Sequence, residues 1–411
     1  MELLVARIVV LLGLAMAVAI VARRLRLPYT VGLLLTGFAL ALARVDVGLE
    51  LTHEIVFDLI LPPLLFEAAL NLPWSELKAD WPPMLMLATL GVLLCAAVVT
   101  AGLVFVFDWP LPPAMTFGAL ISATDPIAVI ALLRETGVKG RLALLIESES
   151  LLNDGAAAVL FGLTLAAFSG AGLAGPWEAI RQFAFIAGGG AAIGAVSAGL
   201  ALLLAGRTDE HLVETAITAV VAYGSFLAAD TLGASGVLAT VTAGLVLGNF
   251  GVLAEPDRPL SLSTQGREFV LAFWEFAAFL ANSFVFLLIG LTLAHIGFGG
   301  VRAAAGIVAL ALLGRAAAVY PACLAFARSR WRVPYPQQHF LWWAGLRGAL
   351  ALALALTLAP DAPYRREILV GAFAVVAFSV LIQGLTAGPA LSVSASPRNR
   401  RAAWKRRRLR W

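Results

Sequence analysis

Long apolar runs cover most of this chain, and they constrain its fold more than any other feature. Hydrophobic residues make up 61% of the 411 positions and charged residues only 13%, whereas about a quarter of the residues in a soluble domain are charged. A helix that spans a bilayer needs about 20 predominantly apolar residues. The composition and the lengths of the runs therefore predict an all-α, polytopic membrane protein.

Clusters of charge, proline and glycine divide these runs into thirteen predicted spans. They cover residues 3–22, 29–43, 53–72, 83–107, 112–134, 142–168, 178–205, 212–230, 235–253, 268–296, 301–327, 338–358 and 366–391. Because thirteen is odd, the termini are expected on opposite sides of the membrane. Most of the 29 Lys and Arg residues fall on the side of the C-terminus, which predicts a cytoplasmic C-terminus and an N-terminus outside.

We expect one transmembrane domain, residues 1–391, followed by a basic cytoplasmic tail, residues 392–411. The tail combines a run of arginines with Trp404 and Trp411, a pattern expected to lie against anionic lipids. A solvated tail that only fixes the topology has the same charge pattern. We expect no nucleotide-binding module and no nucleic-acid partner.

Two of the predicted spans contain residues that interrupt helices. Pro126 lies near the middle of the fifth span and removes a backbone donor. Gly345 and Gly348 weaken the twelfth span. Spans five and twelve are seven apart, as expected for two inverted repeats of six spans joined by one linking span. Paired interrupted helices of this kind indicate a transport site where they cross, at mid-membrane.

Polar residues in the sixth span follow two neighbouring stripes of a helix. Glu147, Ser150 and Asp154 are spaced by three and four residues, and Glu149 and Asn153 lie on the adjacent stripe. Asp154 is about 18 Å into this helix, near the centre of a hydrocarbon layer about 30 Å thick. A carboxylate at that depth indicates an ion or proton path.

Oxygen ligands near Asp154 predict a site for a monovalent cation, most simply Na⁺. The Ser150 hydroxyl, the Asp125 carboxylate and the carbonyl of Thr124, freed by the break, can replace the water around such an ion. Glu67 in the third span can contribute through water, or it can be a purely structural hydrogen-bonded group. A proton and a cation would then compete for one carboxylate.

The buried arginines require anionic partners, because a guanidinium is always charged. For Arg347 in the twelfth span we predict Glu149 as the partner, with Glu147 as the second choice. This pair would hold the twelfth span against the sixth. Arg315 and Glu275 are further charges inside spans, and whether they pair with each other stays open.

Six blocks of this sequence together resemble the electroneutral sodium/proton exchangers of the cation/proton antiporter superfamily, in its bacterial, NhaP-type branch. The blocks occur in the same order along nearly the whole chain. They are LPPLLFEAALNL (61–72), SATDPIAV (122–129), ESESLLNDGAA (147–157), FWEFAAFLANSFVFLLIGL (273–291), GLRGALALALAL (345–356) and VLIQGLT (380–386).

The resemblance implies an antiporter, not an enzyme, that forms a homodimer in the bacterial inner membrane and has no cofactor. It implies a mobile six-helix core, residues 83–168 and 301–391, that moves for alternating access. The interface helices would be residues 1–72 and 212–296, and residues 178–205 would form the linking helix.

The same resemblance suggests roles for the residues at the predicted site. Asp154 matches the carboxylate that exchanges cation for proton, with Asn153 stabilising the site and Ser150 beside it. Electrogenic relatives have Asp at the position of Asn153, so asparagine favours one cation for one proton.

The remaining matches concern the crossing and its support. Thr124 and Asp125 match the unwound crossing, and Glu67 matches a water-linked acidic residue. Glu149 with Arg347 matches the supporting ion pair.

Two other functions use the same residues. A membrane-embedded hydrolase or transferase could use Asp125 and Asp154 as an acid/base pair. A passive cation channel could use the same carboxylates to select ions. A channel needs a continuous pore, whereas an alternating-access site is sealed on one side.

Overall fold

Helices account for all the regular secondary structure in the residues that the computed structural model describes. These are residues 2–25, 27–45, 51–125, 127, 129–130, 133, 140–168, 175–208, 210–254, 261–295 and 301–394. Within them, six helical stretches are long and apolar enough to cross a membrane, namely Trp74–Phe107, Trp177–Ala205, His211–Thr231, Thr264–Ala294, Arg302–Ala325 and Arg365–Leu391. The prediction of an all-α polytopic protein is confirmed.

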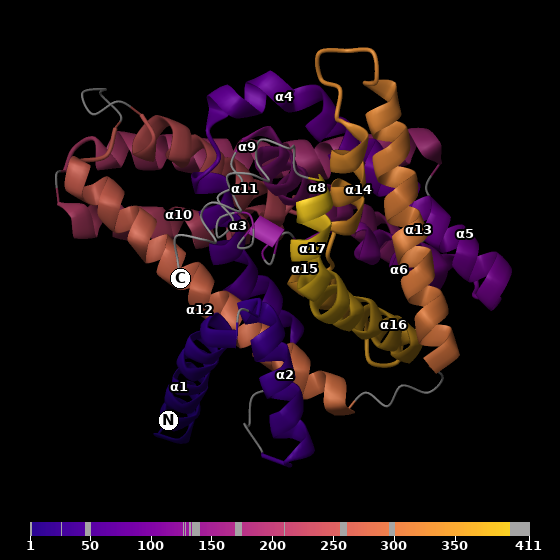
Figure 1. The fold of residues 1–411 in the computed structure, drawn as a ribbon. Helices are drawn as coiled ribbons and strands as arrows, with labels where there is room; N and C mark the ends of the chain where they lie inside the picture. Colours follow the sequence, from indigo (N-terminus) through magenta and orange to yellow (C-terminus); the bar gives the residue numbers. More distant parts are fainter. Residues whose placement is uncertain are drawn as a thin grey trace.

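The helices are labelled in chain order in Figure 1. The first half contains α1 (Glu2–Leu25), α2 (Tyr29–Leu42), the π-helical turn η1 (Ile55–Ile60), α3 (Leu61–Leu70), α4 (Trp74–Met86), η2 (Leu87–Gly91), α5 (Val92–Phe107), α6 (Leu111–Ser122) and α8 (Arg141–Ala166). The second half contains α9 (Pro176–Ala205), α10 (His211–Thr231), α11 (Gly236–Leu247), η4 (Gly248–Val252), α12 (Thr264–His295), α13 (Val301–Ala325), α14 (Tyr335–Trp343), α15 (Ala349–Leu356), α16 (Arg365–Phe378), η5 (Ser379–Gln383) and α17 (Gly384–Ser394).

The helix predicted to start at residue 83 begins earlier, at Trp74. The predicted start lies at a cluster of charge and proline that includes Asp80, Pro82 and Pro83. In the structure the helix kinks at Asp80, with φ −122° and ψ 18°, and both prolines follow that kink. A proline just after a helix interruption removes an N–H that has no helical acceptor there, so the helix tolerates it.

Both predicted interruptions are present in the described residues. Helix α6 ends at Ser122 and residues 123–125 are not helical, while Pro126 lies outside the described residues. Helix α14 ends at Trp343, and α15 begins only at Ala349. The predicted breaks at 124–126 and around Gly345 and Gly348 are therefore confirmed where the chain is described.

The helices pack in two groups that bring together distant parts of the sequence (Figure 1). One group contains α4, α5, α6, α8 and α13–α17, and in it α13 packs on α5 and α16 packs on α13. The other contains α1, α2, α3 and α9–α12, and in it α12 packs on α2 and α11 packs on α9 and α3.

Reciprocal glycines allow the backbones of α2 and α12 to touch. A Cβ on Gly37 would overlap the carbonyl oxygen of Leu287, and a Cβ on Gly290 would overlap that of Leu34. Each helix therefore presents a glycine to the backbone of the other. The two helices come closer at this point than helices that pack through side chains.

An ion pair ties together three segments of the first group. Arg141, at the start of α8, donates from Nε to Asp80 Oδ1 at 2.8 Å. Its other nitrogens donate to the carbonyls of Trp331 and Arg332, at 2.7 and 2.8 Å. Since Asp80 lies at the kink in α4, this arginine connects that kink to α8 and to the loop before α14.

Candidate functional site

The two helix breaks meet through their backbones. The N–H of Asp125 donates to the carbonyl of Leu346 at 2.8 Å, which joins the break after α6 to the break between α14 and α15. The Asp125 carboxylate accepts a hydrogen bond from the N–H of Ile127 at 3.0 Å. It also lies against Gly348, directly before the start of α15, where a Cβ would overlap it. A carboxylate at the start of a helix is favourable because the free N–H groups there carry positive charge.

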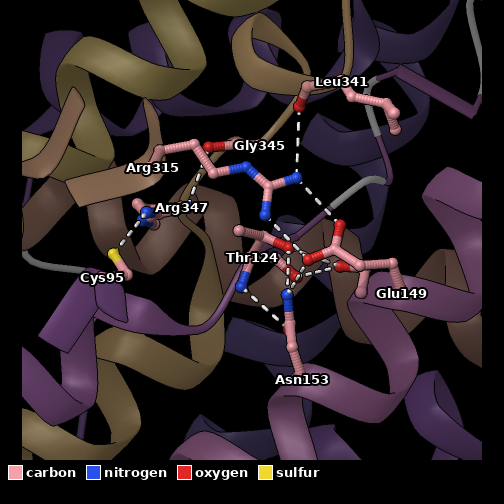
Figure 2. A network of polar contacts seen from close by, with 9 residues as sticks. Cys95, Thr124, Glu149, Asn153, Arg315, Leu341, Gly345 and Arg347 are labelled. Carbon is pink, nitrogen blue, oxygen red and sulfur yellow. Dashed lines mark hydrogen bonds and ion pairs between the residues drawn. The ribbon is translucent and has the colours of Figure 1, made fainter. Parts of the chain in front are cut away.

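Helix α8 binds the first break through its polar residues (Figure 2). Asn153 accepts from the N–H of Thr124 at 3.2 Å and donates to the Thr124 hydroxyl at 2.7 Å. Ser150 donates to the carbonyl of Thr124, and the two hydroxyls are 3.1 Å apart. The backbone polar groups freed by the break are thus bound by side chains of α8, which holds the interrupted segment in place.

Glu149 is the anionic partner of Arg315, not of Arg347. Arg315 on α13 donates to both carboxylate oxygens of Glu149, at 2.7 and 2.8 Å, and to the carbonyl of Leu341 at 3.1 Å. Asn153 donates to Glu149 as well, at 2.8 Å. The prediction that Arg347 pairs with Glu149 is wrong. The sequence left open whether Arg315 pairs with Glu275, and in the structure Arg315 pairs with Glu149 instead.

The break between α14 and α15 explains why Arg315, and not Arg347, pairs with Glu149. Gly345 leaves the space through which Arg315 passes, because a Cβ there would overlap Arg315 Nε. Arg347, two residues later, points toward α5 (Figure 2), where it lies 3.7 Å from the sulfur of Cys95 and 3.0 Å from the carbonyl of Gly345. The sequence showed two buried arginines, but only the path of the backbone decides which one reaches Glu149.

A cavity of about 280 Å³ lies between the two groups of helices, next to the crossing. The residues with side-chain oxygens that line it come from α3, α8, α12 and the first break, and they are Glu67, Thr124, Asp125, Glu147, Ser150, Asp154, Glu275 and Asn282. The predicted stripe of α8, with Glu147, Ser150 and Asp154, thus faces the cavity. The neighbouring stripe, with Glu149 and Asn153, faces the break and Arg315.

The sequence did not single out Asn282, and it gave Arg315 no role at the predicted site. Asn282 on α12 lines the cavity, and its Oδ1 is buried with no hydrogen-bond partner among the described residues. It lies in the block 273–291 without a charge to mark it. Arg315 did carry a signal, because it is a charge in the middle of an otherwise apolar helix.

A family model for "Sodium/hydrogen exchanger, transmembrane" matches residues 9–393 of the chain. The Na⁺/H⁺ antiporter ApNhaP of Aphanothece halophytica is 39% identical over 365 residues, which cover 88% of this chain and 68% of the relative. NhaP of Pseudomonas aeruginosa is 35% identical, covering 89% of this chain and 91% of the relative. NhaH of Halobacillus aidingensis is 33% identical, with coverages of 94% and 96%.

The fold is similar to a solved structure of the sodium proton antiporter MjNhaP1 from Methanocaldococcus jannaschii. The TM-score is 0.77 at 21% sequence identity, and the match covers 96% of this chain and 100% of that one. This likeness concerns the fold alone. Together with the match over residues 9–393, it places the chain among multi-pass membrane transporters and removes the hydrolase alternative. The sequence is similar to the NhaP antiporters of Aphanothece halophytica and Pseudomonas aeruginosa, and the chain belongs to the family of transmembrane sodium/hydrogen exchangers.

Proposed function

We propose that this chain exchanges Na⁺ for H⁺ by alternating access, with both ions competing for the carboxylate of Asp154. One observation carries this proposal. Asp154 faces a cavity that four other carboxylates also line, those of Asp125, Glu67, Glu147 and Glu275, and no Lys or Arg is among its described lining residues. Such a cavity attracts cations from water and brings them to the crossing of the two broken segments.

The ligands of the cation in this proposal are the Asp154 carboxylate with the hydroxyls of Ser150 and Thr124. Those two hydroxyls already contact each other, at 3.1 Å, and both residues line the cavity. Asp125 and Glu67 line the same cavity and complete the site, directly or through water. When a proton occupies Asp154 it removes the negative charge that a cation requires, so binding of one ion excludes the other.

We further propose a ratio of one cation to one proton. Asn153 supports this ratio, because its amide donates to Thr124 and Glu149 and so serves as a structural group with no charge to exchange. Only Asp154 then changes its occupant during the cycle. Exchange of one charge for one charge moves no net charge across the membrane.

The finer architecture belongs to the same proposal. We infer thirteen spans arranged as two inverted six-helix repeats, 1–6 and 8–13, joined by the seventh, with the interrupted fifth and twelfth helices crossing at mid-membrane. The hydrogen bond from Asp125 to Leu346 supports such a crossing. We place the chain in the bacterial inner membrane, with the N-terminus outside and the C-terminus in the cytoplasm.

We propose that the mobile core comprises residues 83–168 and 301–391, and that the interface helices comprise residues 1–72 and 212–296. Helix 178–205 links the two parts. The packing supports this division, because the closest backbone approaches fall within one group of helices: Gly37 to Leu287 in the interface group, and Gly118 to Ala96 in the core. Between the two groups, the close approach of Gly155 on α8 is to the side chain of Leu238 on α11, and side-chain contacts can rearrange more easily.

The partners in this proposal are a second copy of the chain and membrane lipids. The interface helices would form the homodimer contact. Residues 392–411 would bind anionic lipids, and of these only 392–394 lie within the described residues.

Replacement of Asp154 by asparagine tests the function. In proteoliposomes made with the purified protein, Asp154→Asn should abolish sodium-driven proton movement at unchanged melting temperature. Asp108→Asn is the matched control, because Asp108 is exposed at the end of α5 with φ 53°, a conformation that asparagine adopts readily. Substantial exchange by Asp154→Asn, or sodium current without proton movement in the wild type, would contradict the proposal.

A further inference from the structure

Asn282, near the middle of α12, has an unpaired oxygen in the region of the crossing. Its side chain lines the same cavity as Asp154. Its Oδ1 is buried and has no hydrogen-bond partner among the described residues. Buried polar groups rarely lack a partner, because leaving one unpaired costs free energy. In a cavity lined by carboxylates, such an oxygen is suited to bind a cation.

The cavity-facing side of α12 repeats a spacing found on α8. Glu275 precedes Asn282 by seven residues, as Glu147 precedes Asp154, and all four line the cavity. Seven residues are two helical turns, or about 10 Å, so each pair lies on one face of its helix. In the topology proposed above, α8 and α12 cross the membrane in the same direction. An ion from the cytoplasm therefore meets a glutamate on each helix first, and Asp154 and Asn282 beyond them.

Asn282 belongs to a wall that is held in place by its own neighbours. The next residue, Ser283, forms a hydrogen bond with the hydroxyl of Tyr29 on α2. The Tyr29 ring stacks on Phe279, one turn before Asn282, with ring centroids 5.3 Å apart. The reciprocal glycines described above add a close contact between the two backbones. Asn282 is therefore a fixed feature of the interface group.

Most ligands of the proposed cation site come from the opposite group of helices. Asp154, Ser150 and Thr124 all belong to the core. From the interface group Glu67 also lines the cavity, but one of its oxygens already accepts from Asn71 Nδ2, at 3.0 Å. A hard cation takes several oxygen ligands, and amide oxygens are suitable. The unpaired oxygen of Asn282 can provide one from the side of the ion that faces α12.

We propose that Asn282 is a cation ligand of the interface group, whose amide oxygen binds Na⁺ opposite the carboxylate of Asp154. This inference rests on the proposed exchange at Asp154. A proton bonds covalently to that carboxylate and needs no ligand from the opposite wall. Asn282 therefore favours the cation over the proton in their competition, and a bound cation connects the core to the interface group.

The test compares Asn282→Leu, which has a similar size and no oxygen, with Asn282→Asp, which keeps an oxygen at the same place. In proteoliposomes at fixed pH, Asn282→Leu should raise the KM for Na⁺ about tenfold, equivalent to 1.4 kcal/mol of cation binding, at little changed kcat. Asn282→Asp should keep a KM no higher than that of the wild type. The melting temperature of Asn282→Leu should not fall, because Oδ1 has no bond to lose.

Asn249→Leu is the matched control for a structural asparagine. Asn249 accepts from the N–H of Trp74 and donates to the carbonyls of Leu72 and Leu245. Its replacement should lower the melting temperature and leave the KM for Na⁺ unchanged.

An unchanged KM in Asn282→Leu, or the same rise in Asn282→Asp, overturns the inference. If Asn282→Leu does not fold, Asn282→Ala replaces it. Failure of both to fold also overturns the inference, since it would show a structural role for the amide. A wild type that moves no protons with sodium overturns the proposed exchange instead, and equilibrium binding of radioactive Na⁺ to the same purified variants then tests Asn282 separately.

Discussion

Arg315 on α13 binds both carboxylate oxygens of Glu149 on α8, and this pair lies beside the crossing of the broken segments without lining the cavity. Arg315 is 5% exposed and Glu149 is 1% exposed. The pair also holds Asn153 and the carbonyl of Leu341. It therefore connects α8, α13 and the end of α14 at one point.

Removal of either partner should destabilise the protein strongly. Arg315→Ala or Glu149→Ala leaves a buried charge without its partner, which costs about 3–5 kcal/mol. Thermal unfolding in detergent should show a large decrease in melting temperature for both. The control is Arg181→Ala, since the Arg181–Glu178 pair lies on the surface, and its loss should not change the melting temperature measurably. Equal effects of Arg315→Ala and Arg181→Ala would contradict this view of the pair.

A methyl group at Gly348 should inactivate transport. The Cβ of alanine would overlap the Asp125 carboxylate, which must then leave the start of α15. Gly348→Ala should reduce the exchange rate per molecule at least about tenfold, the effect that 1.4 kcal/mol produces. Gly162→Ala in α8 is the control, because a Cβ there has no atom within 4 Å. Similar rates for the two variants would show that Asp125 tolerates displacement.

Asparagine at 153 should not be replaceable by aspartate. Asn153 donates to Thr124 and to Glu149, and an ionised aspartate can donate to neither. Loss of these buried hydrogen bonds costs about 1–3 kcal/mol each, and the new charge repels Glu149. Asn153→Asp should therefore lower both the melting temperature and the rate of exchange. Current recordings on supported membranes should show no transport current, and a stable, current-carrying variant would refute this prediction.

The contact of Arg141 with the kink in α4 should contribute to stability through its side chain. Arg141→Ala removes its bonds to Asp80 and to the carbonyls of Trp331 and Arg332, a loss of about 1–3 kcal/mol in the free energy of unfolding. Arg332→Ala keeps the carbonyl that accepts from Arg141 and should have little effect. Denaturant or thermal unfolding of both variants measures the difference, and equal losses would assign the effect to the loop instead.

Much of the site could be predicted because charges inside apolar helices are rare and conspicuous. Asp154 and the two stripes of α8 followed from helical spacing, and the interruptions followed from Pro126, Gly345 and Gly348. The partner of Glu149 could not be predicted in this way. Two arginines were available, and the choice between them depends on where the backbone runs between α14 and α15. The start of the helix at Trp74 was missed for a similar reason, since the kink at Asp80 makes the following prolines acceptable.

The reciprocal glycines of α2 and α12 have a mechanical consequence. Gly37 and Gly290 each sit against a carbonyl of the other helix, so neither helix can slide along its neighbour without driving backbone into backbone. These two helices must therefore move, or remain in place, as one rigid body. Any displacement that opens the cavity alternately to either side of a bilayer has to take place at another interface between helices.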